Sequence, residues 1–165
     1  MNIYLKSGKG LGKTRIGAFD AALKDAGVYN YNLIRLSSII PPGSVLHLNE
    51  NKPTSEDEWG HKLYAVYADA RTTEPGKWAG AVVGWIQFAD GRGMFTEHEK
   101  IGDDGEVLKK ELEEEAITTI KNLCISRGLE YDEKNIKTMC QVTQATDTHA
   151  AGSVVVASYK SESWR

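Results

Sequence analysis

Residues 14–43, TRIGAFDAALKDAGVYNYNLIRLSSIIPPG, carry the strongest structural signals of the chain. The first half predicts a helix over Thr14 to Ala26, because apolar residues recur at three- and four-residue steps and Gly27 stands where a helix C-cap glycine belongs. That apolar stripe consists of Ile16, Phe19, Leu23 and Ala26. The second half predicts a strand over Tyr31 to Leu36, which ends before Pro41 and Pro42 because prolines cannot donate to a strand ladder. The end of this strand is therefore a candidate place for chemistry.

The flanking sequence is rich in strand patterns and contains one further helix. Met1 to Lys6 predicts a strand, and the Gly/Lys-rich stretch from Ser7 to Lys13 predicts a loop. Glu106 to Arg127 predicts the longest helix, with one apolar stripe among Glu and Lys; its members are Leu108, Leu112, Ala116, Ile120 and Leu123. Further strands are expected over Leu63–Asp69, Trp78–Phe88, Met94–Lys100, Asn135–Thr146 and Gly152–Tyr159, and an exposed loop over Asn49–His61. Without regular βαβ alternation, this order predicts one α+β sandwich domain over residues 1–165.

Composition excludes several classes of function. The 165 residues are 41% hydrophobic and 26% charged, with a net charge of -3, which argues against a nucleic-acid binder because phosphate contacts need a basic face. No apolar run reaches the roughly 20 residues that span a bilayer, and the N-terminus lacks a signal-peptide pattern, so we expect a soluble, cytoplasmic protein. Cys124 and Cys140 form no CxxC pair and are expected to be reduced, partly buried thiols.

The segment from Ser7 to Thr14, SGKGLGKT, resembles a phosphate-binding loop and leaves nucleotide binding as one alternative. It lies between an expected strand and an expected helix, and Asp69 could imitate a magnesium-holding acid. The pattern nevertheless fails at its first glycine, where Ser7 stands. A glycine-rich turn with solvated lysines is the favoured interpretation.

Metal binding is not predicted. The four histidines are scattered and form no HExxH or related spacing; they are His47, His61, His98 and His149. On a strand, Glu97 and Glu99 share one face while His98 points to the other, so only a carboxylate face can be functional there.

Ser37 and Ser38 stand where the predicted strand ends, directly before Ile-Ile-Pro-Pro-Gly. If Ser38 Oγ attacks the carbonyl of Ser37, an ester forms, and β-elimination followed by hydrolysis would leave a pyruvoyl group at position 38. Double serines in turns are also frequent without such chemistry.

The stretch from Ile16 to Pro42 closely resembles the pyruvoyl-dependent arginine decarboxylases. It is matched on AFDAAL at 18–23, Ala26-Gly27, NLIR at 32–35 and LSSIIPP at 36–42. Downstream, the segments 64–69, 79–86 and MFTEHE at 94–99 and the long charged helix follow in the order of that family. The acidic loop around Ser55 to Trp59 and the position of His98 depart from the family pattern, which leaves the choice of substrate open.

The resemblance implies self-processing. Ser38 would be the pyruvoyl precursor and Ser37 the new C-terminus, which gives a β chain of residues 1–37 and an α chain of residues 38–165. Asn32 matches the family asparagine that assists cleavage, and its amide could stabilise an oxyanion on the Ser37 carbonyl. The pyruvoyl group derived from Ser38 would be the only cofactor, with no metal and no pyridoxal phosphate.

The resemblance also implies the reaction, decarboxylation of L-arginine to agmatine and CO2 through a Schiff base, as in polyamine biosynthesis. Glu97 matches the acid that reprotonates the carbanion, so its replacement by glutamine is expected to spare cleavage and slow turnover. Asp20 and Leu23 are the expected substrate-binding residues, with the Asp20 carboxylate accepting two hydrogen bonds from a guanidinium.

The family architecture is a four-layer αββα sandwich that assembles as trimers with active sites between protomers. We therefore expect a homotrimer or a dimer of trimers, no membrane and no nucleic acid. Three alternatives stay open: the same chemistry on another amino acid, nucleotide binding through Ser7–Thr14, and an unprocessed, noncatalytic oligomer subunit.

Overall fold

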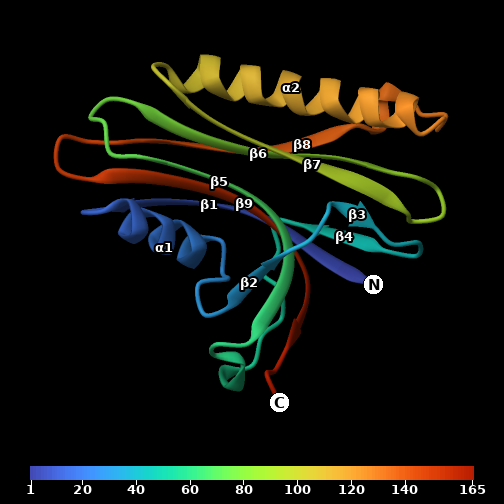
Figure 1. Cartoon of the computed structure of the whole chain (residues 1–165), viewed down its shortest axis with the longest axis horizontal. Helices are drawn as coiled ribbons and strands as arrows, with labels where there is room; N and C mark the ends of the chain where they lie inside the picture. The colour runs from blue at the N-terminus through green and yellow to red at the C-terminus, as the bar shows by residue number, and fades with distance from the viewer.

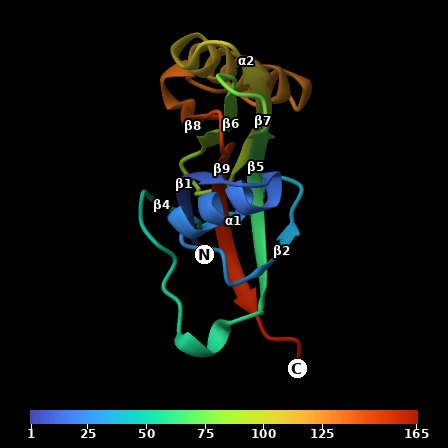
Figure 2. The ribbon, with the colours of Figure 1, turned by 90° about the vertical axis from the view of Figure 1, so that its left-hand side faces the viewer.

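The computed structural model describes residues 1–165 except the side chain of Glu56. Two β-sheets stack face to face, and one helix covers the outer face of each (Figure 1). The view in Figure 2 shows the same succession of layers from the side. The fold is therefore the expected α+β sandwich with four layers in the order α, β, β, α.

The described elements follow one another as β1 (Asn2–Gly12), α1 (Arg15–Asp25), β2 (Asn32–Arg35), β3 (Ile39–Ile40), β4 (Val45–Leu48), the 3-10 helix η1 (Glu56–Glu58), β5 (Lys62–Thr72), β6 (Trp78–Gln87), β7 (Gly93–Gly102), α2 (Gly105–Ser126), the 3-10 helix η2 (Glu133–Asn135), β8 (Lys137–Gln144) and β9 (Ala150–Glu162). The first sheet has the strand order β2-β5-β9-β1-β4, and the second has the order β3-β7-β6-β8. β3 and β4 are too short to stand out as strands in the sequence.

The glycine-rich segment after Lys6 is part of a strand, so its prediction as a loop is wrong. β1 runs on to Gly12 and pairs antiparallel with β9, from Tyr4 opposite Ser158 to Gly12 opposite Ala150. The glycines serve packing, because a Cβ on Gly10 would lie 2.4 Å from the backbone nitrogen of Ala22 in α1. A strand paired in this way does not have the loop conformation that a phosphate-binding interpretation of Ser7–Thr14 requires.

Helix α1 forms where expected, and its predicted stripe is buried except at the first position: Leu23 and Ala26 are buried, and Phe19 packs against the core. Thr14 caps its N-terminus by accepting a hydrogen bond of 3.0 Å from the backbone nitrogen of Gly17. Its buried residues are Ala18, Ala22 and Leu23, whereas Ile16 of the predicted stripe is 68% exposed. Because the glycines of β1 have no side chains, α1 packs so close to this strand that only small side chains of the helix fit between the two elements.

Helix α2 and the core between the sheets follow the sequence pattern. Leu108, Leu112, Ala116 and Ile120 are buried as predicted, and Cys124 takes the last buried position while Leu123 is only partly buried. Between the sheets, side chains of β1, β5 and β9 meet those of β6 and β7 in one apolar cluster. Neither helix in the described part of the chain is long and apolar enough to cross a membrane.

Candidate functional site

The chain turns sharply at Ser38, between β2 and β3. Ser38 has a φ of 66°, in the left-handed region that residues other than glycine rarely occupy. Its carbonyl oxygen accepts a hydrogen bond of 2.8 Å from the backbone nitrogen of Phe95 in β7. Ser37, before it, is exposed, and Ser38 is half-buried. The turn thus holds the Ser37–Ser38 peptide at the edge of the second sheet.

The Ser38 hydroxyl donates a hydrogen bond to the carboxylate of Glu97. Glu97 is half-buried in β7, two residues beyond Phe95. The neighbouring His98 contacts Thr96 and lies 3.4 Å from a carboxylate oxygen of Glu115 in α2, so it points toward the helix layer. The predicted alternation of this strand is confirmed, and it is the Glu97 face that meets Ser38.

A buried tyrosine that the sequence analysis did not single out holds the residue after Ser38. The Tyr159 hydroxyl donates a hydrogen bond of 2.9 Å to the carbonyl oxygen of Ile39. Its ring packs edge-on against Phe95, with centroids 6.4 Å apart. Burial, together with the nearby charge of Glu97, raises the pKa of the Tyr159 hydroxyl, so the group stays a neutral donor. Its one sequence signal is a tyrosine at the end of the long apolar run of β9.

A small hollow of about 230 Å³ opens beside Ser37, Ser38 and Glu97. Arg127, at the C-cap of α2, contributes the one cationic side chain among the described residues that line it. Arg127 is exposed and forms no salt bridge within the described part of the chain. The sequence marked it only as the last residue of a helix, with nothing to connect it to Ser37.

Asn32 is not brought to this hollow within the chain. It is exposed at the start of β2, and its side-chain amide donates a hydrogen bond of 2.7 Å to the carbonyl oxygen of Gly60. Trp164 donates to the same oxygen at 2.9 Å. Asn32 therefore ties the loop before β5 to the start of β2, and its expected role at the Ser37 carbonyl stays a prediction.

Asp20 and Leu23, the expected substrate residues, lie on α1 and do not line the hollow among its described residues. Asp20 is exposed. Leu23 is 8% exposed and packs against β5 and β9 in the core beneath α1. The expected contact between Asp20 and a substrate stays a prediction.

The described residues contain no group of three or more His, Cys, Asp or Glu arranged to hold a metal ion. Both cysteines are free thiols, as predicted. Burial is the main cause that raises the pKa of Cys140 to about 12, and it also raises the pKa of Cys124. Both thiols are therefore protonated at neutral pH and poor nucleophiles.

Comparison with known proteins identifies the family of the chain. The family model described as pyruvoyl-dependent arginine decarboxylase matches residues 2–164. A pyruvoyl-dependent arginine decarboxylase of Halobacterium salinarum is 33% identical over 157 residues, which are 95% of this chain and 92% of the relative. One from Methanococcoides burtonii is 30% identical over 131 residues, 78% of this chain and 71% of the relative. With nearly its whole length matched and its serine pair at the strained turn, the chain belongs to the pyruvoyl-dependent arginine decarboxylase family.

Proposed function

We propose that this chain is a self-processing decarboxylase, which cleaves itself between Ser37 and Ser38 and then converts L-arginine into agmatine and CO2. The observation that carries the proposal is the contact between the Ser38 hydroxyl and the Glu97 carboxylate at a backbone turn with positive φ. Family membership supports the same assignment.

The contact supports a role for Glu97 as the base in cleavage. Ser38 Oγ would attack the carbonyl carbon of Ser37 while Glu97 takes the hydroxyl proton. The C–N bond then breaks, and the nitrogen of residue 38 receives that proton, which leaves an ester and a free amine. Transfer of the Ser38 α-proton to Glu97 and departure of the Ser37 carboxylate give a dehydroalanine. Water then replaces its nitrogen, which leaves as ammonia, and a ketone remains.

Backbone strain favours the same peptide as the site of cleavage. A non-glycine residue held at positive φ costs about 1–2 kcal/mol. The hydrogen bonds from Phe95 and Tyr159 to the carbonyls of Ser38 and Ile39 hold the turn in this conformation. Because cleavage removes the nitrogen of residue 38, the constraint on its φ disappears with the bond. The strain is therefore released only when the reaction proceeds.

Arg127 is suited to receive the carboxylate that cleavage creates. Elimination turns Ser37 into a C-terminus with a full negative charge, in a hollow that Arg127 also lines. A guanidinium binds a carboxylate through two parallel hydrogen bonds and always carries its charge. We assign to Arg127 the stabilisation of this leaving carboxylate.

The surroundings of Ser38 fit a ketone derived from it. The carbonyl of residue 38 is already held by the Phe95 nitrogen, and a half-buried carboxyl lies beside the side chain. A pyruvoyl group there supplies an electron sink when an amino acid loses its carboxylate. Glu97 would deliver a proton to the substrate α-carbon, and Asp20 would accept the fork of hydrogen bonds from the guanidinium.

The proposal includes assembly into a homotrimer or a dimer of trimers. It is supported by the positions of Asp20 and Asn32, neither of which lines the hollow at Ser38 in the single chain. In an assembly, both could reach the hollow of a neighbouring copy. Light scattering behind a sizing column measures the mass, and a monomer with full arginine turnover would contradict this part of the proposal.

Two measurements test the function. Mass spectrometry of the purified protein should give two fragments, residues 1–37 and 38–165, and carbon dioxide release should be faster with arginine than with lysine or ornithine. Equal rates would favour the same chemistry on a broader set of amino acids. A chain that stays intact and releases no carbon dioxide would favour the noncatalytic subunit.

A further inference from the structure

An apolar groove of about 280 Å³ adjoins the hollow at Ser38 and shares Ile39, Met94 and Arg127 with it. β3 forms one wall, the turn between β6 and β7 forms a second, and the residues at the end of α2 form the third. Its apolar lining consists of Ile39, Ile40, Pro42, Phe88, Met94 and Leu129. We call this cavity the Ile39 groove. The proposed cleavage and decarboxylation use none of its apolar side chains.

The walls of the Ile39 groove are joined to each other through the backbone. Ile39 pairs with Met94 between β3 and β7. The backbone nitrogen of Gly43 donates a hydrogen bond of 2.8 Å to the carbonyl of Asp90, which ties the segment after β3 to the turn between β6 and β7. Because these contacts connect the walls directly, the groove has its shape before any ligand binds, which lowers the entropic cost of binding.

Part of the apolar lining faces water. Ile39 is 46% exposed, Pro42 is exposed, and Phe88 and Leu129 are half-buried. A concave surface of apolar side chains with a small number of polar groups is the usual composition of a site for a small molecule. The lining therefore favours a ligand with an apolar body.

The charge of the groove favours an anion. Arg92 and Arg127 are the charged side chains among the described residues that line it. The Arg92 guanidinium lies 3.1 Å from the carboxylate of Asp90, which does not line the groove. Arg127 forms no salt bridge within the described part of the chain. The Arg127 guanidinium is therefore the group that an anionic ligand can bind.

Arg127 is not needed to cap its helix. Basic side chains near a helix C-terminus often hydrogen-bond the last carbonyls. In α2 these carbonyls accept hydrogen bonds from three backbone nitrogens, those of Arg127, Gly128 and Leu129. The end of the helix is thus satisfied by the backbone, which leaves the Arg127 side chain free to bind an external group.

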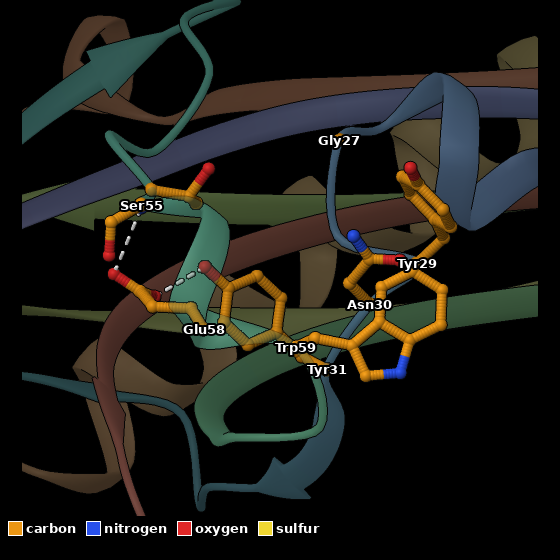
Figure 3. A pocket seen from close by; sticks show the side chains of 8 residues that line it. Gly27, Tyr29, Asn30, Tyr31, Ser55, Glu58 and Trp59 are labelled. Carbon is orange, nitrogen blue, oxygen red and sulfur yellow. Dashed lines mark hydrogen bonds between the residues drawn. The ribbon is translucent and has the colours of Figure 1, made fainter.

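A cavity of similar size, about 270 Å³, lies between the turn after α1 and the loop before β5 (Figure 3) and offers no such free charge. Glu58 is the one charged side chain among the described residues that line it. The Glu58 carboxylate accepts a hydrogen bond of 2.5 Å from the Tyr31 hydroxyl and lies 3.3 Å from the Lys52 ammonium. Its charge is compensated within the chain, whereas the charge of Arg127 is not.

We propose that the Ile39 groove binds a small carboxylate with an unbranched apolar tail, of the size of hexanoate. The carboxylate accepts two parallel hydrogen bonds from the Arg127 guanidinium, and the tail lies against Ile39 and Pro42. A cation is repelled by both arginines, and a neutral molecule lacks the ion pair. The site does not depend on the proposed decarboxylase activity.

Titration with hexanoate at neutral pH and constant ionic strength tests this proposal, with hexanamide as the neutral probe and acetate as the probe without a tail. The full-length Ser38→Ala chain is used, because without the attacking hydroxyl no Ser37 carboxylate arises to compete for Arg127. The methyl signal of Ile39 in a carbon–proton NMR spectrum is assigned by its loss in Ile39→Val. Hexanoate should shift this signal along a saturating curve with a dissociation constant below about 10 mM.

Hexanamide and acetate should bind at least about tenfold more weakly than hexanoate, since each lacks one of the two interactions. Binding of either probe as tight as that of hexanoate, or a linear or absent response to hexanoate, overturns the proposal. A second copy of the chain is the competing occupant of the groove. If the Ile39 signal moves on dilution of the free chain and hexanoate leaves it in place, a second copy covers the groove and the proposal is wrong.

Substitutions at two positions locate the ligand. Arg127→Met should weaken hexanoate binding about tenfold or more, whereas Arg15→Met, which removes an exposed arginine outside the groove, should leave the affinity unchanged. Pro42→Glu adds a carboxylate at a residue that lines the groove but not the hollow at Ser38, and it should also weaken binding about tenfold or more. Pro42→Gln has the same shape without the charge and should retain binding. Unchanged affinity in Arg127→Met, or equal affinity in Pro42→Glu and Pro42→Gln, would refute the proposed site.

Discussion

Replacing Glu97 by glutamine distinguishes two possible roles of this residue: in decarboxylation only, or in cleavage as well. Glutamine has the same shape and keeps an oxygen that can accept the hydrogen bond from the Ser38 hydroxyl. It cannot take a proton. The family resemblance places Glu97 in decarboxylation only, which would leave cleavage of Glu97→Gln intact. The contact with Ser38 supports the proposal that Glu97 also acts in cleavage.

The size of the effect follows from that contact. A positioned general base or acid contributes about 10²- to 10⁴-fold to a rate. If Glu97 receives the Ser38 hydroxyl proton as proposed, Glu97→Gln should slow cleavage by a factor in this range. Decarboxylation by the fraction that does cleave should fall by a similar factor. The melting temperature should change little, since the hydrogen bond to Ser38 is preserved.

The time course of cleavage is measured on a denaturing gel with freshly synthesised protein. The rate of decarboxylation is measured as carbon dioxide release per cleaved chain. Glu99→Gln is the matched control, because Glu99 lies on the same strand and the same face but is exposed and outside the lining of the hollow. It should cleave and turn over at the wild-type rates. Wild-type cleavage of Glu97→Gln would refute the role of Glu97 as the base, and wild-type turnover would remove it from decarboxylation as well.

Three further substitutions test the packing, the leaving group and the substrate. Gly10→Ala should lower the free energy of unfolding by about 2–3 kcal/mol in urea titrations, because its Cβ would meet the backbone of α1 at 2.4 Å. Gly17→Ala should not, because its Cβ would meet the Thr14 hydroxyl at 3.3 Å and the Cα of Gly12 only at 3.8 Å. Arg127→Met should slow the appearance of the two fragments about tenfold without lowering the melting temperature. An unchanged time course would refute the proposed role of Arg127 in stabilising the leaving carboxylate. Asp20→Asn should reduce the preference for arginine over lysine in carbon dioxide release while cleavage continues; an unaltered preference would show that Asp20 does not bind the guanidinium.

Much of the fold could be predicted from hydrophobic periodicity, and the errors have a common physical cause. The stripe of α2 from Leu108 to Ile120 is buried as its spacing predicts. At Gly8 and Gly10, local preference favours a turn, but pairing with β9 and close contact with α1 make the segment a strand. The same contact leaves Ile16 exposed, since helix α1 rests on β1 through alanines. Tertiary packing determines the conformation of Gly8 and Gly10 and the exposure of Ile16, and hydrophobic periodicity in the sequence does not reveal this packing.

The site was less accessible to sequence reasoning. Spacing alone marked Ser37 and Ser38 as a serine pair at a strand end, and family resemblance was needed to select Glu97. The two contacting residues are 59 positions apart, and their meeting depends on β3 pairing with β7. Tyr159 is 120 positions from the carbonyl that it binds. No pattern local to either residue indicates such a contact.

The intact mass of the purified chain tests the central claim most directly. The account predicts that the wild type yields fragments of residues 1–37 and 38–165, that the larger one begins with a ketone reactive toward hydrazines, and that Ser38→Ala remains a single chain of 165 residues. A wild type that stays uncleaved and lacks a reactive ketone after prolonged incubation would contradict it, as would cleavage at the same bond in Ser38→Ala.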